Sequence, residues 1–146
     1  MLIGGVLSSG NITAETRKFD QEKWTDGLIK LPDYMHKPMA TPLAYTSAGR
    51  VGGSVIICGG LGGITSQSAS DRCWRLIADY THWEALPSMS KARAKAAHHS
   101  NGDILIVTGG EDGSGATIAT SEKFLNGKWN PISSLPGATK GYGRGK

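Results

Sequence analysis

The chain has 146 residues, of which 38% are hydrophobic and 19% charged, so it can bury a core and is not expected to be disordered as a whole. Its net charge of +4 arises from 16 basic and 12 acidic residues that are interspersed along the sequence, which is not the pattern of a nucleic-acid-binding protein. No apolar run approaches the roughly 20 residues of a membrane-spanning helix, and the first residues lack the basic start and long apolar segment of a signal peptide, so we expect neither feature.

With 21 glycines and only 7% aromatic residues, the composition favours one all-β domain with many turns. In chain order, we expect three strands of an incomplete unit in residues 1–32, a complete unit in 42–87 and a second complete unit in 95–136. Residues 138–146 are rich in glycine and basic side chains, and we expect a flexible tail there.

The unit at 95–136 has the clearest strand pattern. Its four strand-like runs are AAHHS, DILIVTGG, ATSEKFL and KWNPIS, and Asn101-Gly102 and Asn126-Gly127 join the outer pairs. Both residues of Asn-Gly tolerate the positive φ that a two-residue hairpin turn requires. The run from Ile104 to Val107 is apolar at every position, which predicts a strand covered on both faces. We therefore predict a four-stranded antiparallel meander between two neighbours.

The same features recur in the same order along the chain. A Gly-Gly pair occurs three times, with separations of 55 and 50 residues, at Gly4-Gly5, Gly59-Gly60 and Gly109-Gly110. Such a period is typical of propeller blades. An aromatic residue follows 14 positions after the second glycine, at Phe19, Trp74 and Phe124. A tryptophan and a Leu-Pro pair come next, at Trp24, Trp83 and Trp129 and at Leu31-Pro32, Leu86-Pro87 and Leu135-Pro136.

This order resembles the kelch repeat, in which each unit forms one four-stranded blade of a β-propeller. The family's order is followed by IVTGG, SEKF, KW and SLP in the last unit and by IICGG, RCW, HW and ALP in the middle one. The first unit departs from it, because Met1 falls within what should be its second strand. The resemblance covers residues 1–137 and implies a partial kelch-type β-propeller of about three four-stranded antiparallel blades, the first incomplete. Such a segment leaves blade faces uncovered, so we expect further blades or self-association to cover them.

The recurring residues have structural explanations. Paired glycines let backbone segments pass closely at the end of a buried strand. The aromatic residues fill the space between blades, and the proline of Leu-Pro ends the fourth strand. Structural roles are therefore expected for Gly4, Gly5, Phe19, Trp24, Gly59, Gly60, Trp74, Trp83, Gly109, Gly110, Phe124 and Trp129.

Cys58 and Cys73 lie on strands that are predicted to be neighbours, and two interpretations stay open. A disulfide bond would join the second and third strands of one blade, add roughly 3 kcal/mol in the chain-entropy model and indicate an oxidising compartment. Two reduced thiols in a cytosolic blade fit the sequence equally well. Asn11 begins an Asn-Ile-Thr glycosylation triplet, which moves the odds towards secretion only slightly.

No residue pattern indicates catalysis, a metal or a cofactor. His98 and His99 are adjacent, and adjacent side chains of a strand point to opposite faces, so they cannot hold one metal ion together. The stretches GGLGG and GGEDGSG lack the lysine and the following helix of a phosphate-binding loop. We expect no catalytic residue, no metal site and no cofactor.

The connecting loops are then left to recognise a partner, because loops on a rigid scaffold can vary without cost to the core. The resemblance implies that loops within blades, here 61–70 and 111–117, and loops between blades, here 33–39 and 88–95, gather on one face. The candidate binding residues in these loops are Tyr34, His36, Lys37, Ile64, Gln67, Lys91, Arg93, Glu111 and Asp112.

Lys91, Arg93 and Lys95 alternate with small residues, so they could present positive charge on one side of a strand, although an ordinary solvated edge has the same pattern. The expected function is non-catalytic binding of a protein partner. A fragment of a secreted kelch-like enzyme, such as a carbohydrate oxidase, is the alternative, and glycan binding is a third interpretation. The sequence does not decide between a cytoplasmic and a secreted protein.

Overall fold

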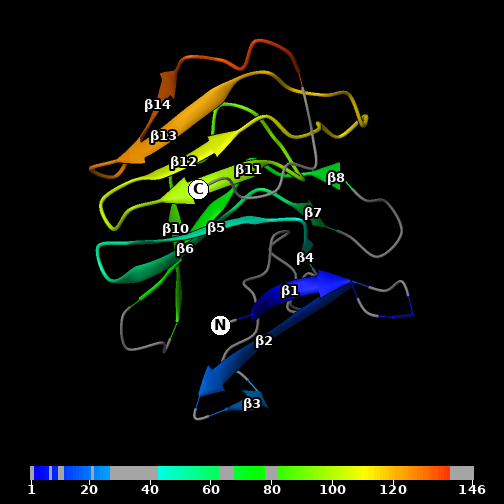
Figure 1. Ribbon diagram of the computed structural model, residues 1–146, viewed down its shortest axis with the longest axis vertical. Coiled ribbons are helices and arrows are strands. Elements are labelled where there is room, and N and C mark those ends of the chain that lie inside the picture. The colour runs from blue at the N-terminus through cyan, green and yellow to red at the C-terminus, as the bar shows by residue number, and fades with distance from the viewer. Residues whose placement is uncertain are drawn as a thin grey trace.

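The structure is a computed structural model that describes residues 2–6, 8–9, 12–20, 22–26, 43–62, 68–77 and 82–138 (Figure 1). Within these residues the chain forms fourteen β-strands and no helix. The strands make four antiparallel sheets, two with four strands and two with three. The predicted all-β class is therefore confirmed.

The first sheet consists of β1 (Leu2–Val6), β2 (Ile12–Asp20) and β3 (Lys23–Asp26), in that order. These are the three strands that the sequence predicts for the incomplete unit. The register of β2 and β3 places Phe19 opposite Trp24.

The two four-stranded sheets have the same meander topology. The middle sheet contains β5 (Ser47–Val51), β6 (Ser54–Cys58), β9 (Cys73–Leu76) and β10 (Trp83–Leu86). The last sheet contains β11 (Ala97–Ser100), β12 (Leu105–Thr108), β13 (Ser121–Leu125) and β14 (Lys128–Ile132). The first two strands of each sheet correspond at a spacing of 50 residues, since Ser47 pairs with Cys58 as Ala97 pairs with Thr108. The meander predicted for residues 95–136 is present.

A small fourth sheet lies next to the Gly59-Gly60 pair that follows β6. It contains β4 (Leu43–Ala44), β7 (Leu61–Gly62) and β8 (Ser68–Ala69). The expectation of a loop over residues 61–70 is therefore wrong near both ends, because β7 pairs with β4 and also with β8. The last unit has the same arrangement reduced to single bridges, from Ala94 to Glu111 and from Glu111 to Thr117.

The core lies between the facing sides of the middle and last sheets. Ile56 and Cys58 of β6 pack with Leu105 and Val107 of β12 and with Phe124 of β13, and each is at most 5% exposed. Burying one such side chain contributes roughly 1.5–3 kcal/mol. This contact holds the two repeating units together.

The two sheets differ on their other faces. In the middle sheet, Ile57 and Leu76 point away from the core and are also buried, so both faces are covered. In the last sheet, Ile104 and Ile106 are only half-buried. The expectation that this strand is covered on both faces is therefore wrong for the described chain, in which only the side towards the middle sheet is fully buried. We call the opposite side the far face.

The inner strands of the two sheets approach each other closely. A Cβ added to Gly49 would lie 2.8 Å from the Leu105 side chain and 2.8 Å from the Cβ of Ser100, which is too close for any real side chain. The N–H of Arg50 donates a hydrogen bond to Ser100 Oγ at 3.3 Å. Only glycine fits between β5 and β11 at this point.

The paired glycines turn the chain after the second strand of each four-stranded sheet. The φ angles are 65° and 98° at Gly59 and Gly60, and 67° and 97° at Gly109 and Gly110. A Cβ added to Gly110 would lie 2.5 Å from the carbonyl oxygen of Ala94. The close backbone approach expected at these glycines is present, and glycine permits the φ values.

Only one of the two predicted Asn-Gly turns has the expected form. Asn126-Gly127 is a two-residue turn with φ angles of 51° and 76°. At Asn101-Gly102 the prediction is wrong, because Ser100 pairs with Leu105 and four residues connect the strands. The side-chain Oδ1 of Asn101 accepts hydrogen bonds from the two N–H groups that follow Gly102, which moves the bend forward by one residue.

Strand register corrects one element of the repeat. Trp129 pairs with Phe124, but the corresponding tryptophan of the middle sheet, Trp83, pairs with Leu76 and not with Trp74. The spacing of 14 residues therefore aligned Trp74 with the wrong position. The connection that contains β7 and β8 is two residues longer than its counterpart in the last unit.

Three of the four tryptophans fill space within the fold. Trp74 is 7% exposed, and Trp83 and Trp129 are half-buried. Trp129 packs on Phe124 with ring centroids 5.3 Å apart, and its Nε1 donates a hydrogen bond to the Pro87 carbonyl oxygen at 3.0 Å. Trp24 is 53% exposed, so the predicted space-filling role is wrong for it in this chain. Its sheet lies at the end of the stack (Figure 1).

The Leu-Pro pairs do not all end a strand. β10 ends at Leu86, directly before Pro87, as predicted. β14 ends at Ile132, three residues before Leu135, so the prediction is wrong there. β14 instead contains Pro131, which is tolerated because an edge strand can lack a donor. The pair Leu31-Pro32 lies outside the described residues.

Candidate functional site

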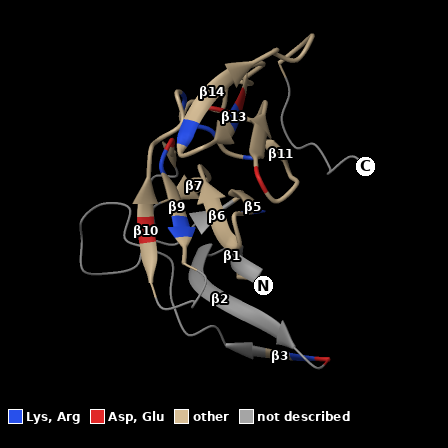
Figure 2. Cartoon of the chain, turned by 90° about the vertical axis from the view of Figure 1, so that its left-hand side faces the viewer, with Lys and Arg blue, Asp and Glu red and all other residues tan. Residues whose placement is uncertain are grey.

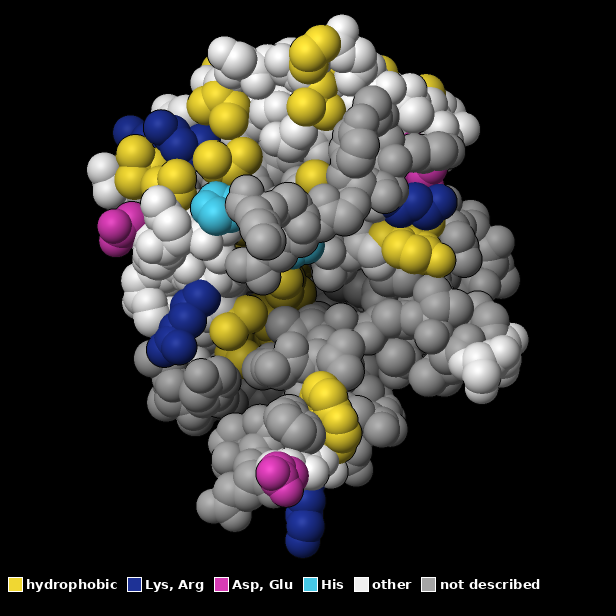
Figure 3. Space-filling model, viewed as in Figure 1, with side chains coloured by type: hydrophobic (Ala, Val, Ile, Leu, Met, Phe, Trp, Pro, Cys, Tyr) yellow, Lys and Arg dark blue, Asp and Glu magenta, His cyan; other side chains and the backbone are white. Residues whose placement is uncertain are grey.

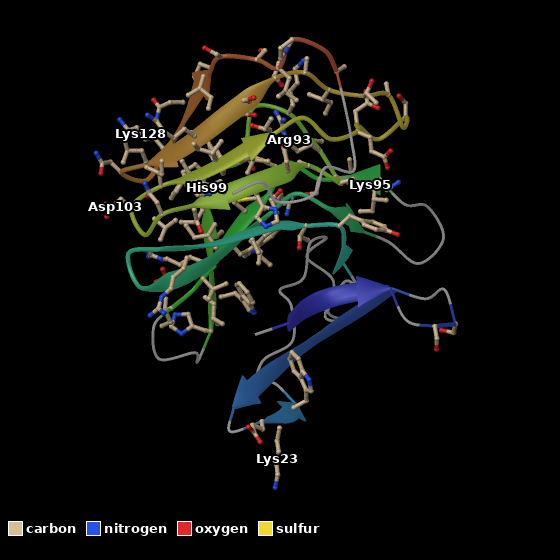
Figure 4. All side chains as sticks on the ribbon, viewed as in Figure 1. Lys23, Arg93, Lys95, His99, Asp103 and Lys128 are labelled. Atoms are coloured by element: carbon tan, nitrogen blue, oxygen red, sulfur yellow. A yellow bond between two sulfur atoms is a disulfide. The ribbon has the colours of Figure 1, made fainter. Side chains whose placement is uncertain are left out.

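The described connections lie at two opposite ends of the four-stranded sheets. Figure 4 shows Lys95 at one end and Asp103 at the other. The end that holds Lys95 and the glycine corners is here called the loop end. The end that holds Asp103 and the turn Asn126-Gly127 is called the turn end.

Two residues of the loop end share an uncommon backbone conformation. Tyr45 and Lys95 have φ angles of 59° and 53°, and they are 50 positions apart in the sequence. Each lies shortly before the first strand of its four-stranded sheet. The N–H of Lys95 donates a hydrogen bond to the Tyr45 carbonyl oxygen at 3.1 Å, which links the two units. The left-handed conformation costs a residue with a side chain roughly 1–2 kcal/mol. Strain of this kind gathers at functional sites.

The side chains of these residues meet a carboxylate. Lys95 Nζ lies 2.6 Å from Glu111 Oε1 and 5.2 Å from the centroid of the Tyr45 ring. The side chain of Glu111 is 7% exposed and that of Lys95 34%, whereas Tyr45 is 50% exposed. A nearly buried carboxylate thus holds an ammonium group beside an exposed ring, an arrangement that adds cation–π attraction to the ion pair.

Asp112 organises the loop that follows Glu111. Its Oδ1 accepts hydrogen bonds from the Ser114 hydroxyl at 2.7 Å, from the Ser114 N–H at 2.8 Å and from the Ala116 N–H at 3.0 Å. The Ser114 hydroxyl, followed by these N–H groups, lowers the pKa of the Asp112 carboxyl below its ordinary value. The charged form of Asp112 therefore fixes the shape of the loop.

Arg93 does not reach the surface, so the expectation that it contacts a partner is wrong. The residue is 1% exposed, and its Nη1 donates hydrogen bonds to the carbonyl oxygens of Gly109 and Thr120 at 2.9 and 2.8 Å. Its Nη2 donates to Thr120 Oγ1 at 3.1 Å and to Glu122 Oε1 at 2.9 Å. Burial lowers the pKa of Arg93, and the negative charge of Glu122 opposes that shift. The guanidinium fastens segment 88–95 to the last sheet.

The other candidate residues divide into two groups. Lys91 is exposed, and Glu111 and Asp112 take part in the contacts of the loop end described above. The remaining candidates, together with the glycosylation triplet, lie outside the described residues: Tyr34, His36, Lys37, Ile64, Gln67 and Asn11.

The sequence does not predict Tyr45 as a site residue, and it indicates only the positive charge of Lys95. The signal that could have found them is the repeat itself, because each stands 15 positions before the second glycine of its unit. Sequence spacing identifies such a matched pair but does not reveal a positive φ at a residue other than glycine.

The two cysteines form a cross-strand pair in the core. Cys58 and Cys73 have Cα atoms 4.2 Å apart, and their sulfur atoms lie at disulfide distance. Each is at most 1% exposed. Among the described residues, no three His, Cys, Asp or Glu side chains gather as a metal site.

A cleft of about 520 Å³ opens at the turn end between the middle and last sheets. Its apolar lining includes Ile56 and Phe124, and Arg75 and the turn Asn126-Gly127 also line it. Arg75 Nε donates a hydrogen bond to Glu84 Oε2 at 3.2 Å, and the hydrogen bonds from Arg75 lower the pKa of the Glu84 carboxyl. The cation at this cleft is therefore already paired within the chain.

Among the described residues, basic and acidic side chains are mixed on the surfaces in view. Figure 2 shows basic and acidic residues on neighbouring strands, and the face in Figure 3 carries both signs in small separate groups. In the part of the chain that the structure describes, there is no helix with the length and hydrophobicity to cross a membrane.

Comparison with known proteins gives a likeness in fold. No family model and no curated protein matches the chain. Among solved structures, the chain is similar to one titled "Structure of YjhT", with a TM-score of 0.74 and 14% sequence identity. The match covers 94% of this chain and 49% of YjhT, so the chain spans about half the length of that protein. At this identity the likeness is one of fold alone.

Proposed function

We propose that the chain is a segment of a kelch-type β-propeller whose sheets are consecutive blades. Two observations support this proposal. The middle and last sheets are four-stranded antiparallel meanders whose inner strands correspond at a spacing of 50 residues. The three-stranded first sheet keeps the pairing of Phe19 with Trp24 that the last sheet has between Phe124 and Trp129.

We further propose that this segment is not catalytic and binds a protein partner through its loop end. The observation that carries the proposal is the group formed by Tyr45, Lys95 and Glu111, in which an exposed ring and an ammonium are held on strained backbone. Aromatic side chains are frequent anchors of protein interfaces. Because Lys95 is already held by Glu111, it loses little conformational freedom when a partner binds. Lys91 is exposed four residues before Lys95 on the same connecting segment.

The proposal is tested by affinity capture with two sets of variants. Tyr45→Ala and Lys95→Ala change the loop end, and Asp103→Ala and Lys128→Ala are matched controls away from it. We expect wild-type and control proteins to retain a common partner that the loop-end variants lose. A photo-reactive residue at position 45 should then cross-link to that partner. Retention by both loop-end variants contradicts the proposal.

A second candidate function is a part of a secreted kelch-like enzyme, such as a carbohydrate oxidase. The disulfide distance between Cys58 and Cys73 favours it, because disulfides persist in oxidising compartments. Thiol titration of denatured protein, purified from its natural source without reductant, separates the alternatives. Absence of free thiols supports secretion, and two titratable thiols support a cytosolic binding module.

A further inference from the structure

The contact between the middle and last sheets shows how one unit covers the next. On the covered face of the middle sheet, one residue from each strand forms a row across the sheet: Gly49, Ile56, Arg75 and Glu84. The covering side of the last sheet contributes Phe124 and Trp129, and Trp129 Nε1 is bonded to the carbonyl oxygen that follows β10. Arg75 and the turn that precedes Trp129 both line the cleft between the two sheets.

The far face of the last sheet has the same row. By strand register, the equivalent residues are His99, Ile106, Lys123 and Asn130. The central isoleucine recurs, and a basic residue again stands beside it. The last sheet covers this row in the middle sheet, whereas no described sheet covers the far face. Ile106 and Lys123 are nevertheless half-buried. The far face is therefore composed like a face that another sheet covers.

The first sheet offers the matching covering side. Trp24 occupies the position of Trp129, because each pairs with the phenylalanine of the preceding strand. It is 53% exposed, whereas Trp129 is half-buried. The turn before Trp24 holds Glu22 at the position of Gly127, and Glu22 is exposed. A sheet docked in the manner of the last sheet thus brings Glu22 to the equivalent cleft that Lys123 lines, so an acidic side chain of one surface and a basic side chain of the other line the same cleft.

The two rows differ at the residue contributed by the first strand of each sheet. Gly49 has no side chain because β11 approaches it, whereas its counterpart on the far face is His99. The first sheet has the order β1-β2-β3, and in its described part no strand occupies the position of β11. A histidine is therefore accommodated where the middle sheet needs glycine.

We propose that two copies of this chain associate head to tail, with the first sheet of one copy covering the far face of the other. In this pair, the Trp24 ring lies beside the Ser133 backbone of the other copy, because Ser133 follows β14 as Pro87 follows β10. Head-to-tail contacts close when their rotation allows it. The chain spans 49% of YjhT, so a second copy supplies about the remaining length of such a fold, and two contacts close the pair.

Sedimentation of the 146-residue chain tests the association. We expect the wild type to sediment as a pair of 15.4 kDa chains. Lys123→Glu and Glu22→Lys each place like charges across both contacts, so each should weaken the pair about tenfold. An equal mixture of the two variants should restore it, because the reversed charges then meet in one contact and the native charges in the other.

Lys91→Glu is the matched control, since it makes the same charge change at the loop end and should leave the pair intact. Ile106→Arg should abolish the pair, and circular dichroism of each variant checks that it is folded. A monomeric wild type, or a pair that neither charge reversal weakens, overturns the proposal. Growth into longer assemblies overturns closure into a pair. These residues are separate from Tyr45 and Lys95, so the inference rests on the proposed stacking of blades and not on the proposed binding surface.

Discussion

Replacing Arg93 by methionine removes the cation that fastens segment 88–95 to the last sheet. Methionine keeps much of the aliphatic volume, so the substitution tests the hydrogen bonds more than the packing. The change removes the donors to Gly109, Thr120 and Glu122. The Glu122 carboxylate, whose side chain is 4% exposed, then keeps its hydrogen bond from the Ser90 N–H but loses its cation.

The expected loss in the free energy of unfolding is about 3 kcal/mol. Removing one partner of a buried ion pair costs roughly 3–5 kcal/mol, because a buried charge is left unpaired. The hydrogen bond from Ser90 to Glu122 places the value near the lower limit. A loss of this size is a large part of the roughly 5–15 kcal/mol that stabilises a typical domain. The double variant Arg93→Met and Glu122→Leu should lose less than the sum of the single changes, since it removes both charges.

Urea denaturation followed by tryptophan fluorescence measures these differences. Lys91→Met is the matched control, because Lys91 is exposed two residues away and its replacement should change stability by less than about 0.5 kcal/mol. If Arg93→Met is as stable as this control, the buried network does not hold the segment, and the structural role assigned to Arg93 is wrong.

Three further predictions concern the core, the glycine corners and the loop end. Replacing Cys58 and Cys73 by serine should lower the free energy of unfolding by about 3 kcal/mol, and reductant should reproduce the loss in the wild type; denaturation curves that reductant leaves unchanged contradict a formed bridge. Gly110→Ala should destabilise the fold more than Gly127→Ala in thermal unfolding, because a Cβ at Gly110 meets a carbonyl oxygen at 2.5 Å, whereas at Gly127 only the positive φ opposes it, at about 1–2 kcal/mol. Since the folded pKa of Asp112 is lowered, its stabilisation of the loop is present above the unfolded pKa of about 3.9 and is lost as pH falls through the folded pKa. Amide hydrogen exchange of the loop should follow this titration, and Asp112→Asn should remove it.

The spacing of glycines and aromatic residues was enough to predict the sheets and their meander order. Glycine pairs mark positions where no side chain fits, and such a restriction is visible in a single sequence. Gly110 is an example, because its φ and its distance from Ala94 both require glycine. The turn Asn126-Gly127 was predictable because both of its residues tolerate the positive φ that the turn requires.

Positions that depend on packing between units were not predictable in this way. Trp74 fell at the expected spacing, yet the β7–β8 connection shifts the register, so Leu76 takes the position of Phe124. Arg93 reads as one of three alternating surface charges, and only the approach of the last sheet makes it a buried donor. Local sequence patterns do not show which distant segment packs against a residue.

The fit around Gly49 has a consequence for the shape of the stack. At the edge formed by the first strands, nothing bulkier than the hydrogen of Gly49 separates β5 from β11. At the edge formed by the fourth strands, the indole of Trp129 lies between β14 and Pro87. Two sheets that touch along one margin and are propped apart along the other must splay, and the residues at the two margins decide the angle. Enlarging position 49 would tilt one sheet against its neighbour. The distance between Tyr45 and Lys95, which belong to different units, would then change without any alteration to either residue.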